Sequence, residues 1–507
     1  MNKKHLIIHG HFYQPPRENP WTDEIDPEFS AAPFHDWNER ILQECYKPNT
    51  EAVIVNSHGD IIRRVNNYEY LSFNFGPTLF SWLRKKHRHT YEKIIDADKK
   101  SIIKNNGQGN AIAQVYNHII MPLASEQDKI TQVKWGVKDF EFHFARKPAG
   151  MWLAETACNN ETLKVLADEG IKFTILDPSQ AYAIRKIGSE QWVSKPELEL
   201  DTSRPYRFFT NEKFIDVFFY NGKLAREIAF DDLIFHSEKL MDRIVNLSYG
   251  FRMISAATDG ETFGHHKHFA DRSIAYLFSE LTSTNGFSVT NYSNFLKLNP
   301  PDYEVILDNG PLGEGNSWSC AHGVGRWSDD CGCHTGGENG WNQKWRKTLR
   351  FALNDLAVKL DYVFIKATKH LLKDHRQARN EYIDIMLNPD SETIEKFFYF
   401  NSVKYLDQSE VNLCLKLLEM QKYRMFMFTS CGWFFSDITN IETIQILKYA
   451  AKAVELTADA TGNDFENVFL KNLKEVKGNT KSLPTAADVY RKKIKPLSKS
   501  KHRIRIM

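Results

Sequence analysis

Residues 250–264 have the sequence GFRMISAATDGETFG, in which an apolar strand segment is followed at once by acidic residues. A similar change from a short apolar run to polar residues occurs in EAVIVNSHGDIIRR (51–64), GIKFTILDPSQA (170–181) and KFIDVFFYN (213–221). Helical patterns separate these runs up to about residue 290. Short strands that alternate with helices predict βα units and a largely parallel sheet or barrel, with functional residues at the carboxyl ends of the strands.

The composition is that of a globular protein of several domains. The 507 residues are 42% hydrophobic and 26% charged, and the length predicts roughly two to four domains. A net charge of +2 argues against binding nucleic acid through bulk electrostatics, and no apolar run is long enough to span a membrane. Seven thinly spread cysteines do not suggest a secreted disulfide framework, so we expect a cytoplasmic protein.

Four parts are expected along the chain. Residues 1–300 carry the strand–helix alternation, and residues 301–346 are dense in Gly, Asn, Asp, Trp and Cys. Residues 347–480 have apolar residues at helical spacing, which predicts a helical domain. Residues 481–507 form a basic tail that we expect to be flexible.

Two acidic segments suggest a chemical site. Glu155 follows an apolar stretch in KPAGMWLAETACNNETL (147–163), and Asp259 and Glu261 flank Gly260. Taken alone, Glu155 fits the start of a helix, and Asp259 fits an Asp-Gly turn. Taken together, they offer the two carboxyl groups that hydrolysis of a glycosidic bond requires, one ionised and one protonated. Glu261 is expected to order its loop rather than perform chemistry.

A third polar segment follows the first predicted strand. The stretch HLIIHGHFYQPPRENPW (5–21) places His9, His11 and Gln14 directly after three apolar residues. The Pro15-Pro16 pair stiffens the loop beside them. We expect these side chains to line a ligand site and to bind sugar hydroxyls.

These segments, taken in order, resemble the motifs of glycoside hydrolase family 57, in the branch with a C-terminal domain of unknown function. HGHFYQPP resembles the first motif of that family and AQVYNHIIMPL (113–123) the second, with His118 and Pro122 in the expected places. GMWLAET (150–156) resembles the third motif and TDGETFGHH (258–266) the fourth. TSCGWFFSD (429–437) is the best match to the fifth.

The resemblance implies an α/β fold: an incomplete seven-stranded (β/α) barrel with a helical C-terminal region that completes the active-site cleft. It implies a retaining enzyme that acts on oligo- or polysaccharide α-glucans without a cofactor or a catalytic metal. Glu155 would be the nucleophile and Asp259 the general acid/base. The exact activity, the linkage preference and the oligomeric state stay open. The predicted substrate-binding residues are His9, His11, Gln14, His118, Trp152, His265, Trp318, Arg326, Trp327 and Trp433.

The loop SWSCAHGVGRWSDDCGCHTGG (317–337) departs from the better-known members of that family. Cys320, Cys331, Cys333, His322 and His334 offer the ligand types of a zinc site. The Cys331-Gly332-Cys333 spacing is tighter than usual for structural zinc. We therefore favour a tryptophan-stiffened active-site loop with buried thiols and leave zinc binding open.

Two other functions fit the same residues. His9, His11, Asp259 and His265 could together hold zinc in a metal-dependent hydrolase of the mannosidase or deacetylase type. Alternatively, the chain could be a non-catalytic glucan-binding protein. The presence of both carboxylates argues against the binding protein, and a lone His-x-His pair is a weak signal for metal.

Overall fold

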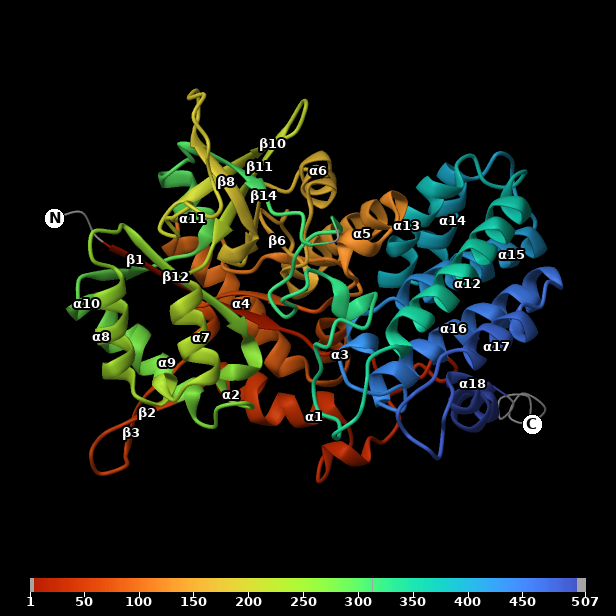
Figure 1. The fold of residues 1–507 in the computed structure, drawn as a ribbon, viewed down its shortest axis with the longest axis horizontal. Coiled ribbons are helices and arrows are strands. Elements are labelled where there is room, and N and C mark those ends of the chain that lie inside the picture. The colour runs from red at the N-terminus through yellow and green to blue at the C-terminus, as the bar shows by residue number, and fades with distance from the viewer. Residues whose placement is uncertain (1–3, 312, 499–507) are drawn as a thin grey trace. The chain divides into compact units, whose positions relative to one another are not determined.

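The computed structural model describes residues 4–311 and 313–498, which divide into two compact units. Within these limits the first unit comprises residues 4–14, 27–115 and 140–309, and the second comprises 15–26, 116–139 and 310–498. Figure 1 labels their helices and strands. The strands, all in the first unit, are β1 (Lys4–Phe12), β2 (Ala52–Val55), β3 (Ile61–Val65), β4 (Ser72–Phe75), β5 (Ala113–Gln114), β6 (Met151–Trp152), β7 (Phe173–Leu176), β8 (Ala181–Lys186), β9 (Val193–Ser194), β10 (Pro205–Phe209), β11 (Phe214–Phe219), β12 (Met253–Asp259), β13 (Phe287–Val289) and β14 (Tyr303–Leu307).

Helices surround these strands and make up most of the second unit. Those of the first unit are α1 (Trp37–Ile41), α2 (Lys47–Asn49), α3 (Pro77–Lys86), α4 (Arg88–Lys104), α6 (Asn160–Asp168), α7 (Gly222–Phe230), α8 (Ser237–Leu247), α9 (Ala270–Tyr276), α10 (Thr282–Thr284) and α11 (Tyr292–Leu298). Helix α5 (Glu126–Phe144) begins in the second unit, and its last residues belong to the first. The others of the second unit are α12 (Trp345–Thr368), α13 (His375–Leu387), α14 (Ser391–Asn401), α15 (Gln408–Phe426), α16 (Ile441–Thr461), α17 (Glu466–Lys474) and α18 (Ala486–Val489).

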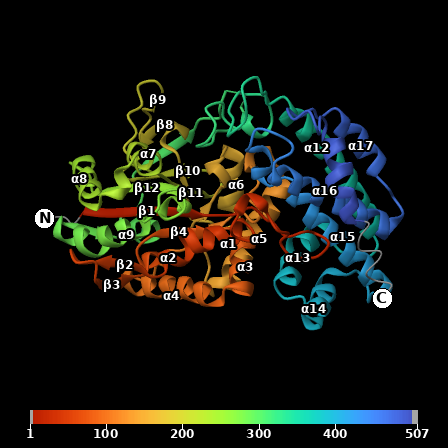
Figure 2. The same cartoon turned by 90° about the horizontal axis from the view of Figure 1, so that it is seen from below.

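Strand β1 is the centre of the first unit. It pairs in parallel with β12 on one side, and with β13 and β4 on the other. Leu6, Ile7 and Ile8 of β1 are fully buried, as expected for a strand covered on both faces. Figure 2 shows helices of this unit on both sides of β1.

Parallel pairing continues beyond β4. A bridge from Phe73 to Ala111 leads towards β5, which pairs with β6, and a bridge from Gly150 to Phe173 leads to β7, which pairs with β11. The order β12, β1, β4, β5, β6, β7, β11 thus places the carboxyl ends of all these strands at one edge. Residues that follow the strands along the chain therefore meet at that edge.

Two parts of the unit depart from the predicted parallel arrangement. The segment EAVIVNSHGDIIRR was expected to be a strand–helix unit, but it forms an antiparallel hairpin of β2 and β3. Its turn contains Gly59 at φ +89°, a conformation that favours a hairpin turn over a helix start. Beyond β11, the sheet continues through β10, β14, β8 and β9 with mostly antiparallel pairs.

The second unit is built around three long helices. Helices α12, α15 and α16 pack against one another, and they lie side by side in Figure 1. Leu349, Leu353 and Leu360 of α12 are fully buried, as are Leu417 of α15 and Leu447 of α16. The spacings of four and seven residues within α12 are those of the apolar stripe predicted for the helical region.

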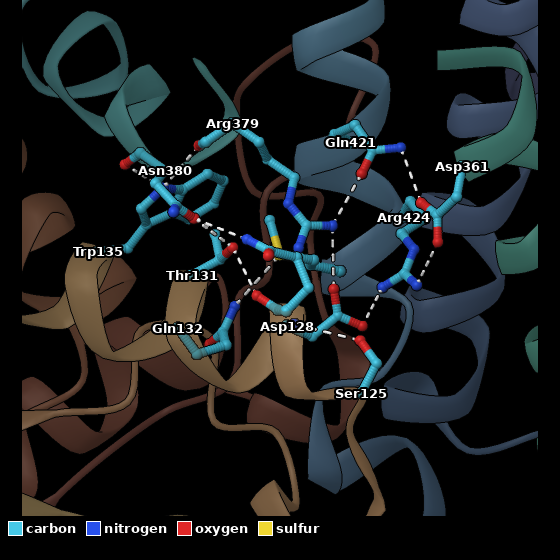
Figure 3. Close-up of polar contacts among 12 residues, drawn as sticks. Ser125, Asp128, Thr131, Gln132, Trp135, Asp361, Arg379, Asn380, Gln421 and Arg424 are labelled. Carbon is cyan, nitrogen blue, oxygen red and sulfur yellow. Dashed lines mark hydrogen bonds and ion pairs between the residues drawn. The ribbon is translucent and has the colours of Figure 1, made fainter. Parts of the chain in front are cut away.

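A buried ion network joins the first turns of α5 to this bundle (Figure 3). The Asp128 carboxylate lies 2.5 Å from Nη1 of Arg424 and 3.0 Å from Nη1 of Arg379. Arg424 also pairs with Asp361 at 2.8 Å, and Gln421 donates a hydrogen bond to Asp361. Burial opposes ionisation of Asp128, but the two guanidinium groups outweigh it and hold the pKa of its carboxyl below the usual value.

The C-terminal end of the described chain is helical. Helix α18 is followed by a helical turn at Tyr490–Ile494. Our expectation of a flexible tail falls partly on residues 499–507, which lie outside the described residues. Over the described chain, no helix has both the length and the apolarity that crossing a membrane demands.

Candidate active site

His9 and His11 of β1 form a column of flat rings with Trp152 of β6. The Trp152 indole stacks on His9 at 4.8 Å and on His11 at 5.1 Å between ring centroids. Tyr13 stacks on His11 at 5.5 Å. The alternation of a strand puts His9 and His11 on the same face, which is why both reach one indole. The column fixes the start of the segment that carries Glu155.

Asn74 at the end of β4 orients both histidines. His9 contacts Ser72 Oγ through Nδ1 at 3.0 Å and Asn74 Oδ1 through Nε2 at 3.1 Å. Asn74 Nδ2 lies 2.9 Å from Nδ1 of His11 and donates to Gln114 Oε1 at 2.8 Å. Asn74 Oδ1 accepts from Nε2 of His9, so the proton of that ring is on Nε2, and the same oxygen lies 3.3 Å from Nδ1 of His11. Asn74 and Gln114 were missed in the sequence, although each lies at a strand end.

Burial keeps both imidazole rings neutral. It lowers the pKa of His9 and of His11 to about 3, and the mutual effect of the two rings adds to the shift of His11. His9 is fully buried, and both its ring nitrogens are engaged within the protein. We therefore assign His9 a supporting role behind His11 and Trp152.

Glu155 has a left-handed backbone conformation. It follows β6 in a short turn at Ala154–Thr156, with φ 57° and ψ 23°, and Thr156 also has a positive φ of 51°. A side chain other than Gly costs about 1–2 kcal/mol in this region. Such strain persists where the surroundings enforce it and is found preferentially at functional sites.

Asp259 ends β12 and is the register partner of His11 on the adjacent strand. Its side chain is exposed to solvent, yet dense surrounding protein removes much of its hydration. This desolvation, followed by the charges of Glu155 and Glu261, raises the pKa of Asp259 to about 8. The carboxyl group is therefore protonated at neutral pH, and Glu155 acts on it electrostatically.

Glu261 ties the end of β12 to neighbouring segments. Its Oε1 accepts hydrogen bonds from Gln14 Nε2 at 2.6 Å and from the Tyr46 hydroxyl at 3.0 Å. The same loop carries His265, whose Nδ1 makes a short contact with the Glu44 carboxylate. Tyr46 is fully buried and was not anticipated from the sequence.

Two further polar groups lie at the ends of β7 and β11. The Tyr220 hydroxyl, just after β11, donates to Asp177 Oδ2 at 2.6 Å, just after β7. Burial and then the charge of Asp177 raise the pKa of Tyr220, and the charge of Asp259 contributes to the same shift. Both residues were missed in the sequence, although both directly follow strand segments that it identified.

The other predicted site residues belong to the second unit. His118, with φ 57°, contacts Ser430 Oγ through Nδ1 at 2.7 Å, and its carbonyl accepts from the Ser430 amide. The second and fifth motif segments therefore contact each other directly. Trp318 is half-buried, whereas Arg326 is buried and donates to Thr335 Oγ1 and to the Phe434 carbonyl.

Trp327 and Trp433 differ from the prediction that they contact sugar rings. Both indoles are fully buried in the second unit. The Arg350 guanidinium lies 4.0 Å from the Trp433 ring centroid, and the Trp433 indole donates to the Arg346 carbonyl. These side chains fill the core of the unit, and neither has a ring face available to a ligand in this structure. The sequence alone does not distinguish a tryptophan that fills a core from one that contacts a ligand.

The predicted alternative of a catalytic zinc ion does not fit the geometry. In the described part of the chain, His9, His11, Asp259 and His265 do not form a group with ligand atoms close together. His265 is engaged by Glu44, and both nitrogens of His9 are engaged by neutral partners. A group with ligand geometry lies elsewhere, in the loop at Cys320–Cys333.

The comparison with protein families agrees with this arrangement of strand-end residues. The model of glycosyl hydrolase family 57 matches residues 6–307, which is more than half of the chain. The chain therefore belongs to glycosyl hydrolase family 57. A second model, a domain of unknown function (DUF3536), matches residues 341–506.

Individual relatives are distant. An alpha-amylase of Pyrococcus horikoshii is 26% identical over 257 residues, which is 49% of this chain and 37% of the relative. A 4-alpha-glucanotransferase of Thermococcus litoralis is 23% identical over 256 residues, 49% of this chain and 36% of the relative. The chain thus spans well under half the length of these curated relatives.

The fold is shared with solved structures. An exo-type maltose-forming amylase from Pyrococcus sp. ST04 superimposes with a TM-score of 0.67 at 16% sequence identity, over 93% of this chain and 83% of that one. At this identity the likeness concerns the fold: an α/β part with a helical C-terminal region.

Proposed function

We propose that this protein is a retaining glycoside hydrolase or glycosyl-transferring enzyme that acts on α-glucans. In this proposal the parallel strands from β12 round to β11 form the incomplete seven-stranded (β/α) barrel expected from the sequence. The carrying observation is the environment of Asp259 at the end of β12, where desolvation and then the nearby charge of Glu155 raise the pKa of its carboxyl and leave the proton on one of two neighbouring carboxyl groups. The names of the relatives support the substrate class. A cytoplasmic location stays a prediction.

In the first step, Glu155 attacks the anomeric carbon as the glycosidic bond breaks. Asp259 donates its proton to the leaving oxygen, so the departing sugar carries a hydroxyl group and the other sugar is held as an ester of Glu155. Asp259, now ionised, then removes a proton from water or from an acceptor sugar hydroxyl, whose oxygen displaces Glu155. Two inversions at the anomeric carbon retain its configuration.

The surrounding residues would set up this reaction. Neutral His11 would hydrogen-bond a sugar hydroxyl without adding a charge beside Asp259. Asn74, which contacts Nδ1 of His11, holds the orientation of the ring. The Glu155 turn, enforced by the chain, positions the carboxylate before the substrate binds.

The test is a comparison of wild-type protein with Glu155→Gln on maltoheptaose and amylose, with products resolved by length and linkage. We expect the variant to lose at least about 10³-fold in kcat, since the nucleophile is gone. Glu161→Gln, an exposed position in α6, is the matched control and should keep full activity. Shorter products alone indicate hydrolysis, longer products indicate transfer, and α-1,6 linkages indicate branching.

A second measurement identifies the role of Glu155 directly. In Glu155→Ala, added azide can enter the space of the missing carboxylate and attack the same face of the sugar. We expect it to restore turnover of an activated α-glucoside and to give the β-glycosyl azide. Wild-type protein with no turnover on any α-glucan, or a Glu155→Gln variant with near wild-type rates, would contradict the proposal.

A further inference from the structure

Four potential metal ligands converge in the loop that precedes α12. They are Cys320, His322, Cys331 and Cys333, and their ligand atoms all lie within 4.8 Å of one another. The Cys320 sulfur lies 3.8 Å from both the Cys331 and the Cys333 sulfur, and Cys333 Sγ lies 3.5 Å from His322 Nδ1. All four residues belong to the second unit.

These separations match the edges of a zinc tetrahedron. With Zn–S bonds of about 2.3 Å and a Zn–N bond of about 2.0–2.1 Å, tetrahedral angles give S···S separations of roughly 3.8 Å and S···N separations of roughly 3.5 Å. A disulfide would instead need sulfurs about 2.05 Å apart. We propose that Cys320, His322, Cys331 and Cys333 bind one structural zinc ion.

The backbone is arranged for two ligand pairs with a single residue between the members of each. Gly332, between Cys331 and Cys333, has φ +82°, a turn that lets both sulfurs point to one centre. Cys320 and His322 form the second pair. A Cβ on Gly325 would lie 3.1 Å from that of Cys331, so the chain packs closely against the ligands. This one-residue spacing, shorter than the usual zinc spacing, is why the sequence pattern left zinc binding open.

Backbone amides support the sulfur atoms. The amides of His322 and Arg326 donate hydrogen bonds to the Cys320 sulfur, and the amide of Ala321 donates to Cys333. Hydrogen bonds of this kind orient thiolate ligands around a metal. His334, considered with the others from the sequence, is exposed and contacts the Gly332 carbonyl instead.

The charge around the cluster also favours a zinc–thiolate centre. Zn²⁺ with three thiolates and a neutral imidazole carries a net charge of −1. Arg346, fully buried, contacts the Cys333 carbonyl, and Arg326 is also buried nearby. Within residues 4–311 and 313–498, neither arginine forms an ion pair with a carboxylate. The zinc–thiolate centre would be the negatively charged partner that these two guanidinium groups otherwise lack.

The proposed role is to fix the loop rather than to perform chemistry. Four protein ligands leave no open position for water or substrate, as in structural zinc sites. The loop is joined to the fifth motif segment, because Ser436 Oγ donates to the Thr335 carbonyl and Arg346 donates to the Phe434 carbonyl. Zinc would therefore hold this connection and the position of Trp318 on the same loop.

Metal analysis of the full-length protein, purified under reducing conditions without chelator, tests the proposal. We expect about one zinc per chain. Reconstitution with Co²⁺ should give the intense visible bands of a tetrahedral ion together with thiolate-to-cobalt charge transfer in the near ultraviolet. Removal of the metal should lower the melting temperature by several degrees, and added Zn²⁺ should restore it.

Variants locate the ion. Cys333→Ser and His322→Ala should lose stoichiometric zinc and the cobalt bands, whereas Cys431→Ser, a half-buried cysteine outside the cluster, should retain both. Metal-free wild-type protein that takes up no zinc when reduced would overturn the proposal, and so would zinc that persists in Cys333→Ser. Iron in place of zinc, or a disulfide among these cysteines in freshly purified protein, would also overturn it. None of these readouts depends on glucan turnover.

Discussion

His11 and Asp259 are register partners on adjacent parallel strands, and desolvation shifts both of their pKa values so that each group is uncharged at neutral pH. The imidazole has a pKa of about 3 and the carboxyl a pKa of about 8. A proton donor and a neutral hydrogen-bonding ring thus lie side by side, next to the segment that carries Glu155.

The first prediction concerns activity and pH. Asp259 must carry a proton to act as the acid. The value of kcat/KM on maltoheptaose should therefore be maintained up to neutral pH and fall as the pH rises through about 8. Asp259→Asn should lower kcat by about 10²–10⁴-fold and remove this alkaline limb. A wild-type profile that stays flat well above pH 8 would exclude Asp259 as the acid.

The second prediction concerns stability at the same residue. The folded-state pKa of Asp259 is raised from the ordinary value of 3.8 to about 8, so the folded protein loses stability as the pH rises between these values. Asp259→Asn removes that loss. Its melting temperature should equal that of wild type below about pH 4 and exceed it above about pH 8. If the melting temperatures of Asp259→Asn and wild type differ by the same amount at every pH, ionisation of Asp259 is not the cause of the difference.

The third prediction tests the backbone strain at Glu155. Glycine tolerates φ 57° and alanine does not, so Glu155→Gly should be more stable than Glu155→Ala by about 1 kcal/mol, although glycine is the more flexible residue. Both variants should be inactive, and denaturant unfolding would compare them. If the alanine variant is the more stable one, the turn has relaxed and the strain is absent.

The fourth prediction concerns the network of Figure 3. Asp128→Asn leaves the charges of Arg424 and Arg379 buried without their shared partner, which should destabilise the protein by about 3–5 kcal/mol. The loss should shrink in acid, because Asp128 stabilises the fold only while it is ionised.

Asp168→Asn provides the control for that measurement. Asp168 pairs with Lys164 at 2.8 Å on the surface of α6, and both side chains are exposed. Exposed pairs contribute about 1 kcal/mol or less, so this variant should differ little from wild type in thermal unfolding. If the two substitutions change the stability by similar amounts, the buried network contributes no more to the stability than an exposed ion pair does.

The sequence predicted the strand-end residues better than their partners. His9, His11 and Glu155 follow or end apolar runs, and alternation alone places the two histidines on one face. Asn74 and Gln114 could not be found in this way, because they act through contacts between strands far apart in the chain. β5 and β6 are only two residues long, too short for any periodicity.

Residues in loops were identified from the sequence, but their surroundings were not predicted. Trp433 was expected to contact a sugar ring because of its place in the motif at 429–437, yet it fills a core, because packing across the unit decided its environment. The cysteines at 320, 331 and 333 were visible as a group, but the distances among them depend on turns such as the one at Gly332. Such turns follow from tertiary contacts that a spacing rule does not contain.

The ring of Phe12 fills the space that a side chain would need at both Gly10 and Gly260, so any larger residue at either position must displace it. Libraries that randomise the first and fourth motifs would therefore return mostly misfolded clones at these two glycines. Engineering for new linkage preferences should keep Gly10, Phe12 and Gly260 unchanged and vary exposed loop positions instead.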